Sequence, residues 1–112
     1  MTNKKLFKVE TYDAFETPPY SGRPLYVGSF DTAEEALACA KKVIDDQLRK
    51  VIESGRSAED AIGSFSAAGE IPMIFGEGSI YLQPFEYAKG RAPEIALSVY
   101  APQINKIESS EE

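Results

Sequence analysis

Two short segments near the beginning of the chain are predicted to be β-strands, and the first alternates between apolar and polar residues, which is typical of a strand with one buried face. In the first segment, residues 6–12, the apolar face consists of Phe7, Val9 and Thr11. Residues 25–30 form the second segment. The sequence therefore predicts two strands that pair as a hairpin, joined by a long loop because too many residues separate them for a tight turn.

A longer apolar stripe with helical spacing occupies residues 32–54. Its members are Ala33, Ala36, Leu37, Ala40, Val43, Ile44, Leu48 and Val51. Asp31 followed by Glu34 resembles a capping box, and Gly55 is a typical residue after a helix end. We expect the opposite face to be exposed to solvent, because it carries charge pairs four positions apart: Lys41–Asp45, Lys42–Asp46, Asp45–Arg49 and Asp46–Lys50.

A second, shorter helix is predicted from Ser57, a good capping residue, to Ala68, with Gly69 as its end. Its apolar stripe consists of Ala58, Ala61, Ile62, Phe65 and Ala68. A hairpin of residues 71–75 and 79–82 is expected to follow, with its turn at residues 76–78. Because Pro72 has no N–H, its strand should lie at a sheet edge or begin after the proline.

The last part of the chain predicts a short helix and a final strand. Pro84 suits the first position of a helix, which Gly90 would end after a turn or two. Residues 94–100 alternate again, with Ile95, Leu97 and Val99 on one face. Nothing is periodic after Pro102. We expect one domain in residues 1–104 and an acidic, frayed tail in residues 105–112.

Together these elements predict an α+β fold with the order ββααβ(β)αβ. Strands with one apolar face and a helix with one apolar stripe need each other as packing partners. We therefore expect a small, mainly antiparallel sheet with one face covered by the helix of residues 32–54. The helix of residues 57–68 should pack at the edge of that layer.

Composition narrows the function classes. The 112 residues include no histidine and one cysteine, which excludes histidine-based acid–base catalysis, a Ser-His-Asp triad, a Cys-His dyad and the usual zinc sites. The net charge of −6 has the wrong sign for a protein that coats nucleic acid or an anionic membrane. No signal peptide and no run of about 18 apolar residues is visible, and a lone cysteine fits a reducing compartment. We expect a cytoplasmic protein without a cofactor.

Three candidates for chemistry are weak in the sequence. Cys39 lies at the margin of the long apolar stripe with carboxylates nearby, which favours an inert packing residue over a nucleophile. Gly76-Glu77-Gly78-Ser79 lacks the further glycine or lysine of a phosphate loop and is better explained as a hairpin turn. The acidic residues match no metal-binding motif. We therefore assign no catalytic, cofactor or metal residue.

The loop of residues 12–24 is the most unusual segment, because it combines aromatic residues, three prolines and an arginine. Such residues on a stiffened loop suit a contact surface. The alternative is a loop that folds over the end of the core and buries its aromatic residues. We predict a mixed outcome, in which Phe15 points inward while Tyr20 and Arg23 stay accessible as the candidate contact surface.

Several short motifs resemble a group of small uncharacterised bacterial proteins of about this length. They are Gly28-Ser29-Phe30-Asp31-Thr32 with Glu34-Glu35-Ala36-Leu37, Ser57-Ala58-Glu59-Asp60, Gly69-Glu70-Ile71-Pro72, and Phe85-Glu86-Tyr87-Ala88. The likeness covers roughly residues 5–91 and consists mostly of helix-start signals. It implies a bacterial, cytosolic protein of unknown function, and it carries no functional residue over.

Three functions remain open at this point. The first is a non-enzymatic interaction or accessory domain with a protein partner or with self-association. The second is a small-ligand binder or minor enzyme that uses Arg23, Arg91, Tyr20 and carboxylates such as Asp13. The third is an acidic regulator that docks a basic partner, since residues 57–112 carry three Lys or Arg against nine Asp or Glu.

Overall fold

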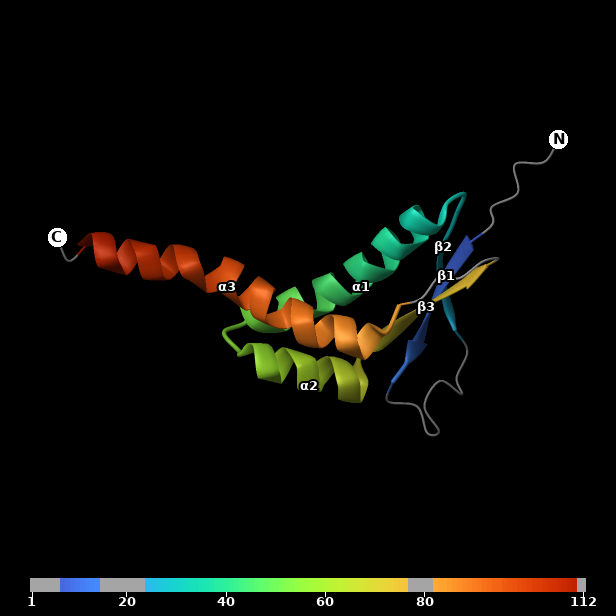
Figure 1. The fold of residues 1–112 in the computed structure, drawn as a ribbon. Helices are drawn as coiled ribbons and strands as arrows, with labels where there is room; N and C mark the ends of the chain where they lie inside the picture. Colours follow the sequence, from blue (N-terminus) through green and yellow to red (C-terminus); the bar gives the residue numbers. More distant parts are fainter. Residues whose placement is uncertain (1–6, 15–23, 77–81, 111–112) are drawn as a thin grey trace.

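The chain folds into a three-stranded sheet and three helices (Figure 1). The computed structural model describes residues 7–14, 24–76 and 82–110, with residues 102–110 as backbone only. In chain order the elements are β1 (Phe7–Asp13), β2 (Leu25–Phe30), α1 (Ala33–Glu53), α2 (Ala58–Ala68), β3 (Glu70–Gly76) and α3 (Pro84–Ser110). The predicted α+β class is confirmed.

The sheet has the strand order β2-β1-β3, with both neighbours antiparallel to the central β1. Phe7, Val9 and Thr11 are buried, as the alternation in β1 predicts. Pro72 lies in β3, which is an edge strand, as its missing N–H requires. A bulge interrupts the pairing of β1 with β2 between Val9 and Glu10. The predicted hairpin partner of β3 falls mostly on residues 79–81, which lie outside the described residues.

All three helices lie on one side of the sheet (Figure 1). The long helix α1 begins one residue later than the sequence suggested. Its cap is Thr32, whose side chain accepts a hydrogen bond from the Glu35 N–H while the Glu35 carboxylate accepts one from the Thr32 N–H. The tandem Glu34-Glu35 permits either register, because each glutamate follows a capping residue by three positions.

The interior of the protein consists of two hydrophobic clusters, and α1 contributes to both. Beside the sheet, the small residues Ala36 and Ala40 pack with Phe7 and Val9. The second half of α1 instead joins α2, β3 and α3 in the larger cluster: Ile44, Leu48, Ile52, Ala61, Phe65, Ile71, Ala88, Ala92 and Ile95. Thus α1 covers the sheet as predicted, but most of the buried apolar side chains lie between the helices.

The predicted strand of residues 94–100 and the predicted helix end at Gly90 are wrong, because α3 continues through both. Over seven residues, the spacing of the apolar side chains fits a strand as well as a helix. The buried residues Ala88, Ala92 and Ile95 reveal the helical stripe, and Leu97, which a strand would have buried, is 68% exposed. Pro93 removes one backbone donor without ending the helix.

Candidate functional site

The strongest candidate site is the face of the sheet turned away from the helices. Here Glu10 lies between Tyr26 of β2 and Met73 of β3, and Lys8 lies between Ser29 and Phe75. We call this face the outer sheet surface and define it by six side chains: Lys8, Glu10, Tyr12, Tyr26, Met73 and Phe75. Lys8, Glu10 and Tyr12 take the positions opposite the buried face of β1, and the register of the sheet places the other three residues beside Lys8 and Glu10.

A small polar network occupies the centre of the outer sheet surface. The Lys8 Nζ lies 3.1 Å from the Glu10 Oε2, and the Tyr12 hydroxyl donates a 3.3 Å hydrogen bond to the Glu10 Oε1. The Lys8 ammonium also lies 5.8 Å from the centre of the Phe75 ring. Burial, followed by the charge and the hydrogen bond of Glu10, raises the pKa of Tyr12. Both oxygens of the Glu10 carboxylate are therefore engaged within the surface.

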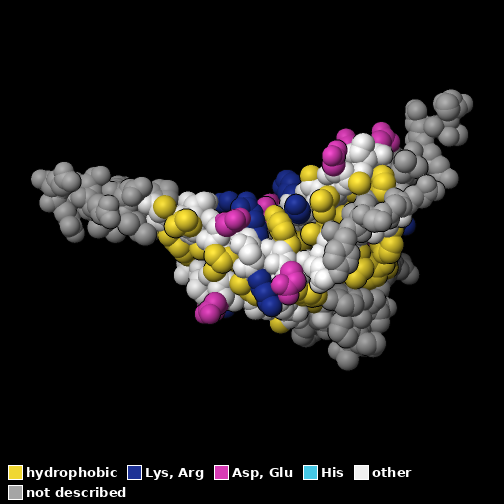
Figure 2. All heavy atoms as spheres, viewed as in Figure 1, with side chains coloured by type: hydrophobic (Ala, Val, Ile, Leu, Met, Phe, Trp, Pro, Cys, Tyr) yellow, Lys and Arg dark blue, Asp and Glu magenta, His cyan; other side chains and the backbone are white. Residues whose placement is uncertain are grey.

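Exposed apolar side chains lie on the two strands that flank this network. Among the described residues, five large hydrophobic side chains are exposed, and four of them lie on the edge strands: Leu25, Tyr26, Val27 and Phe75. Tyr26 is 62% exposed and Phe75 is 42% exposed. Figure 2 shows hydrophobic side chains gathered at the sheet end of the molecule. Exposed apolar groups that lie together, with aromatic residues among them, are typical of contact surfaces.

These exposed residues of β2 were not predicted as a contact surface, although the sequence contains a signal for them. Leu25, Tyr26 and Val27 are consecutive apolar residues in a strand with one buried face. Since neighbouring side chains point to opposite faces, at least one of the three has to point away from the core. All three are exposed.

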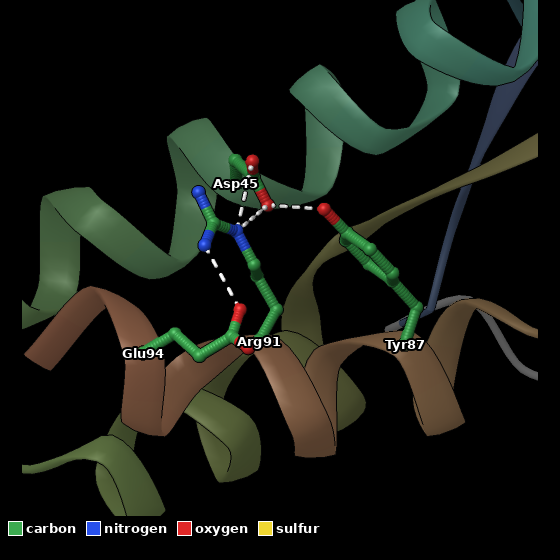
Figure 3. A network of polar contacts seen from close by, with 4 residues as sticks. All are labelled: Asp45, Tyr87, Arg91 and Glu94. Carbon is green, nitrogen blue, oxygen red and sulfur yellow. Dashed lines mark hydrogen bonds and ion pairs between the residues drawn. The ribbon is translucent and has the colours of Figure 1, made fainter.

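A second polar cluster fastens α3 to α1 (Figure 3). The Asp45 carboxylate of α1 accepts a 2.9 Å hydrogen bond from the Tyr87 hydroxyl and two 3.2 Å hydrogen bonds from the Arg91 Nε. Arg91 also donates from its Nη1 to Glu94 at 3.0 Å. The Lys41 ammonium lies 5.5 Å from the centre of the Tyr87 ring. The face of α1 that was expected to be solvent-exposed is therefore partly covered by α3.

The protonation of this cluster suits a fastening role. Burial, followed by the hydrogen bond and the charge of Asp45, raises the pKa of Tyr87 to about 12. Its hydrogen bond to Glu94 and then that to Asp45 raise the pKa of Arg91. Tyr87 therefore stays a neutral donor and Arg91 a cation near neutral pH. Neither group is prepared to accept a proton.

A third contact joins the same two helices near the end of α1. The Tyr100 hydroxyl lies 2.7 Å from the Ile52 carbonyl oxygen and 2.8 Å from the Arg56 carbonyl oxygen. The single proton of this hydroxyl is shared between a carbonyl in the last turn of α1, which also accepts the Gly55 N–H, and a carbonyl of the segment between α1 and α2. The contact depends on the continuation of α3 through residues that the sequence assigned to a strand.

Cys39 is half-buried on α1 and packs against the smaller hydrophobic cluster. Burial raises the pKa of its thiol, and nearby Lys42 opposes this only in part. The expected inert character is consistent with that direction, but the cause is burial rather than the neighbouring carboxylates.

The predicted contact residues Tyr20 and Arg23, together with Phe15, lie outside the described residues. The proposed ligand set is not assembled by the two members that are described. Arg91 is bound to Asp45 and Glu94, whereas Asp13 is the last residue of β1. Of the predicted phosphate-loop alternative, only Gly76 is described, as the end of β3.

Two further findings concern sites that the described residues could have formed. No group of three or more acidic or cysteine side chains among them could hold a metal ion. Within the same residues, no helix is both long and apolar enough to cross a membrane.

Comparisons of the chain with protein-family models, curated proteins and solved structures found no match. The assignment of roles therefore depends on the geometry alone.

Proposed function

We propose that the protein is a non-enzymatic interaction domain that binds a protein partner through the outer sheet surface. The observation that carries this proposal is the concentration of exposed apolar side chains on the two edge strands, of which Tyr26 and Phe75 lie beside Glu10 and Lys8 on the outer face. These side chains do not contribute to the hydrophobic clusters that hold the fold together. A partner that covered them would remove apolar area from water.

The chemistry of the surface favours a protein over a nucleic acid. Its two charged residues, Lys8 and Glu10, neutralise each other in an ion pair. A nucleic-acid surface would instead carry an excess of Lys and Arg toward the phosphates, and the whole chain has a net charge of −6. Tyrosine, phenylalanine and methionine around a satisfied polar centre are the composition of a protein interface.

The alternative of an acidic regulator has less support. Three of the carboxylates described in residues 57–101 already have cationic partners within the chain: Asp60 with Arg56, Glu86 with Lys89, and Glu94 with Arg91. A surface that docks a basic partner would keep its carboxylates uncompensated and on one face. Most of the carboxylates described in this half of the chain are instead compensated.

We also retain two proposals from the sequence. A cytoplasmic location is supported by the single half-buried cysteine, which has no second thiol in the chain to pair with. Membership of the group of small uncharacterised bacterial proteins is supported by the helix-start motifs alone. Neither proposal bears on the interaction surface.

Site-specific photo-crosslinking in living cells tests the proposed function. The photoreactive residue p-benzoylphenylalanine replaces Tyr26 or Phe75 and, in two control proteins, the exposed helix residues Lys42 or Glu59. We expect the same discrete adduct from both outer positions and much less from the controls. An adduct of twice the protein mass identifies a second copy as the partner. Equal labelling from all four positions, or no adduct from Tyr26 and Phe75, would contradict the proposal.

A further inference from the structure

The protein contains an open cavity of about 540 Å³ at the junction of α1, α2 and the beginning of β3. Its lining consists of Gln47, Lys50, Val51, Ser54, Arg56, Ser64, Phe65, Ala68, Gly69 and Glu70. The volume lies in the range of small-molecule sites in proteins. None of these residues belongs to the outer sheet surface.

One wall of the cavity is fixed in place by its hydrogen bonds. The Gln47 side chain donates a 2.8 Å hydrogen bond to the Glu70 carbonyl and accepts one of 2.8 Å from the Glu70 N–H. Gly69, beside it, has no room for a side chain, because a Cβ there would lie 2.5 Å from the Phe65 carbonyl oxygen. The wall is therefore preorganised, and Gln47 is occupied with holding it rather than available to a ligand.

The lining of the cavity carries two cations and one carboxylate. Lys50 makes no hydrogen bond or ion pair with any residue that the structure describes. Arg56 approaches Asp60 at 3.7 Å through its Nε, which leaves the outer end of the guanidinium facing solvent. Glu70 is the one carboxylate in the lining. A cation without a partner at the rim of a preorganised cavity favours an anionic ligand group.

The rest of the lining is suited to an apolar ligand body. Val51 and Ala68 supply hydrocarbon surface between the two helices, and Phe65, which is buried in the larger hydrophobic cluster, supports the floor of the cavity beneath them. A ligand that uses both features carries a negative group at one end and a short apolar or aromatic group at the other. We infer that this cavity binds a small organic carboxylate, with Lys50 and Arg56 facing the carboxylate and Val51 and Ala68 contacting its apolar part.

Titration of the protein with phenylacetate tests this site, with backbone amide shifts in NMR spectra as the readout. Benzyl alcohol has the same apolar body without the charge, and acetate has the charge without the body. We expect saturable shifts at Lys50, Ser64 and Gly69 with phenylacetate, and affinities about tenfold lower for the other two compounds. The inference would be overturned if no saturable shifts appeared at phenylacetate concentrations up to about 30 mM, which is well above the dissociation constant expected for so small a ligand.

Matched variants locate the binding within the cavity. Lys50→Met should lower the phenylacetate affinity about threefold to tenfold, because it removes the cation but keeps the stem of the side chain. Lys42→Met is the control, since Lys42 lies on the same helix but is bonded to Asp46. Ala68→Leu should also weaken binding by filling part of the cavity. If Lys42→Met weakens binding as much as Lys50→Met, or if Ala68→Leu leaves the affinity unchanged, the site assignment is wrong.

Discussion

The two faces of the sheet differ in what holds their side chains. On the inner face, Phe7 and Val9 are buried against α1, so a substitution that changes the size of either side chain would disturb the packing. On the outer face, Tyr26 and Phe75 are exposed to solvent, and their neighbours Lys8 and Glu10 form an ion pair with each other. The same strands thus separate residues that the fold needs from residues that it does not need.

This difference identifies where a function resides in a protein without an evident catalytic centre. Side chains that fill the core are explained by stability, so they carry no separate functional signal. Exposed aromatic side chains have no such explanation, and they cost solubility when nothing covers them. The following predictions test whether the two kinds of position behave as differently as their surroundings imply.

The largest effect is expected in the helical core. Leu48 is fully buried in the larger cluster, so Leu48→Ala should lower the free energy of unfolding by about 2–5 kcal/mol. Leu97→Ala is the matched control, because Leu97 is 68% exposed on α3 and should change stability by less than about 0.5 kcal/mol. Urea denaturation curves measure both. Similar losses of stability in the two variants would mean that the face of α3 that carries Leu97 is buried.

The next effect concerns the cluster that fastens α3 to α1. Asp45→Asn removes the charge that Tyr87 and Arg91 share, and we expect a loss of about 1–2 kcal/mol of stability, limited by the partial exposure of the pair. Asp46→Asn changes the adjacent residue, whose ion pair with Lys42 is exposed, and should cost less than about 0.5 kcal/mol. Equal effects in urea denaturation would refute the fastening role of Asp45.

A smaller effect should appear at high pH. The pKa of Tyr87 in the folded protein is about 12, above the ordinary value of 10.0, so the native state holds this proton more tightly than the unfolded chain does. The resulting stabilisation is complete below pH 10 and is lost as the pH rises toward 12. An absorbance titration should show one tyrosine that ionises last, and Tyr87→Phe should remove it. Persistence of that last step in Tyr87→Phe would show that another tyrosine causes it.

The smallest effect is expected on the outer sheet surface. Tyr26→Thr keeps a residue that suits a strand while it removes the exposed ring, so stability should change by about 0.5 kcal/mol or less. Thermal or urea denaturation measures the difference from the unaltered protein. A loss as large as that of Leu48→Ala would mean that Tyr26 belongs to the core of the fold.

Much of the fold could be predicted from the sequence because its signals were local. The alternation of β1, the cap of α2 and the edge position of Pro72 each depend on a few neighbouring residues, whereas the cap of α1 lies one residue after the predicted Asp31. Helix α3 was mispredicted because Gly90 resembles a helix end and residues 94–100 alternate like a strand, and the packing of Ala92 and Ile95 in the larger hydrophobic cluster overrides both signals.

The candidate site was harder to predict because it is defined by pairing between strands. Glu10, Tyr26 and Met73 are far apart in the sequence and become neighbours only through the register of the sheet. The cavity likewise depends on how α2 and β3 meet α1. In contrast, the lack of histidine is a property of the composition, and it limits the available chemistry whatever fold the chain adopts.

The most direct test of the interaction surface measures folding and partner binding in the same variants. With p-benzoylphenylalanine in place of Val27, the cellular adduct is compared between the otherwise unaltered protein and the double variant Tyr26→Thr/Phe75→Thr, with Leu97→Thr as the control for an exposed apolar residue on α3. We predict that the double variant stays folded by circular dichroism and loses most of the adduct, while Leu97→Thr retains it. An adduct that persists unchanged in the folded double variant would contradict the assignment of the outer sheet surface as the site of interaction.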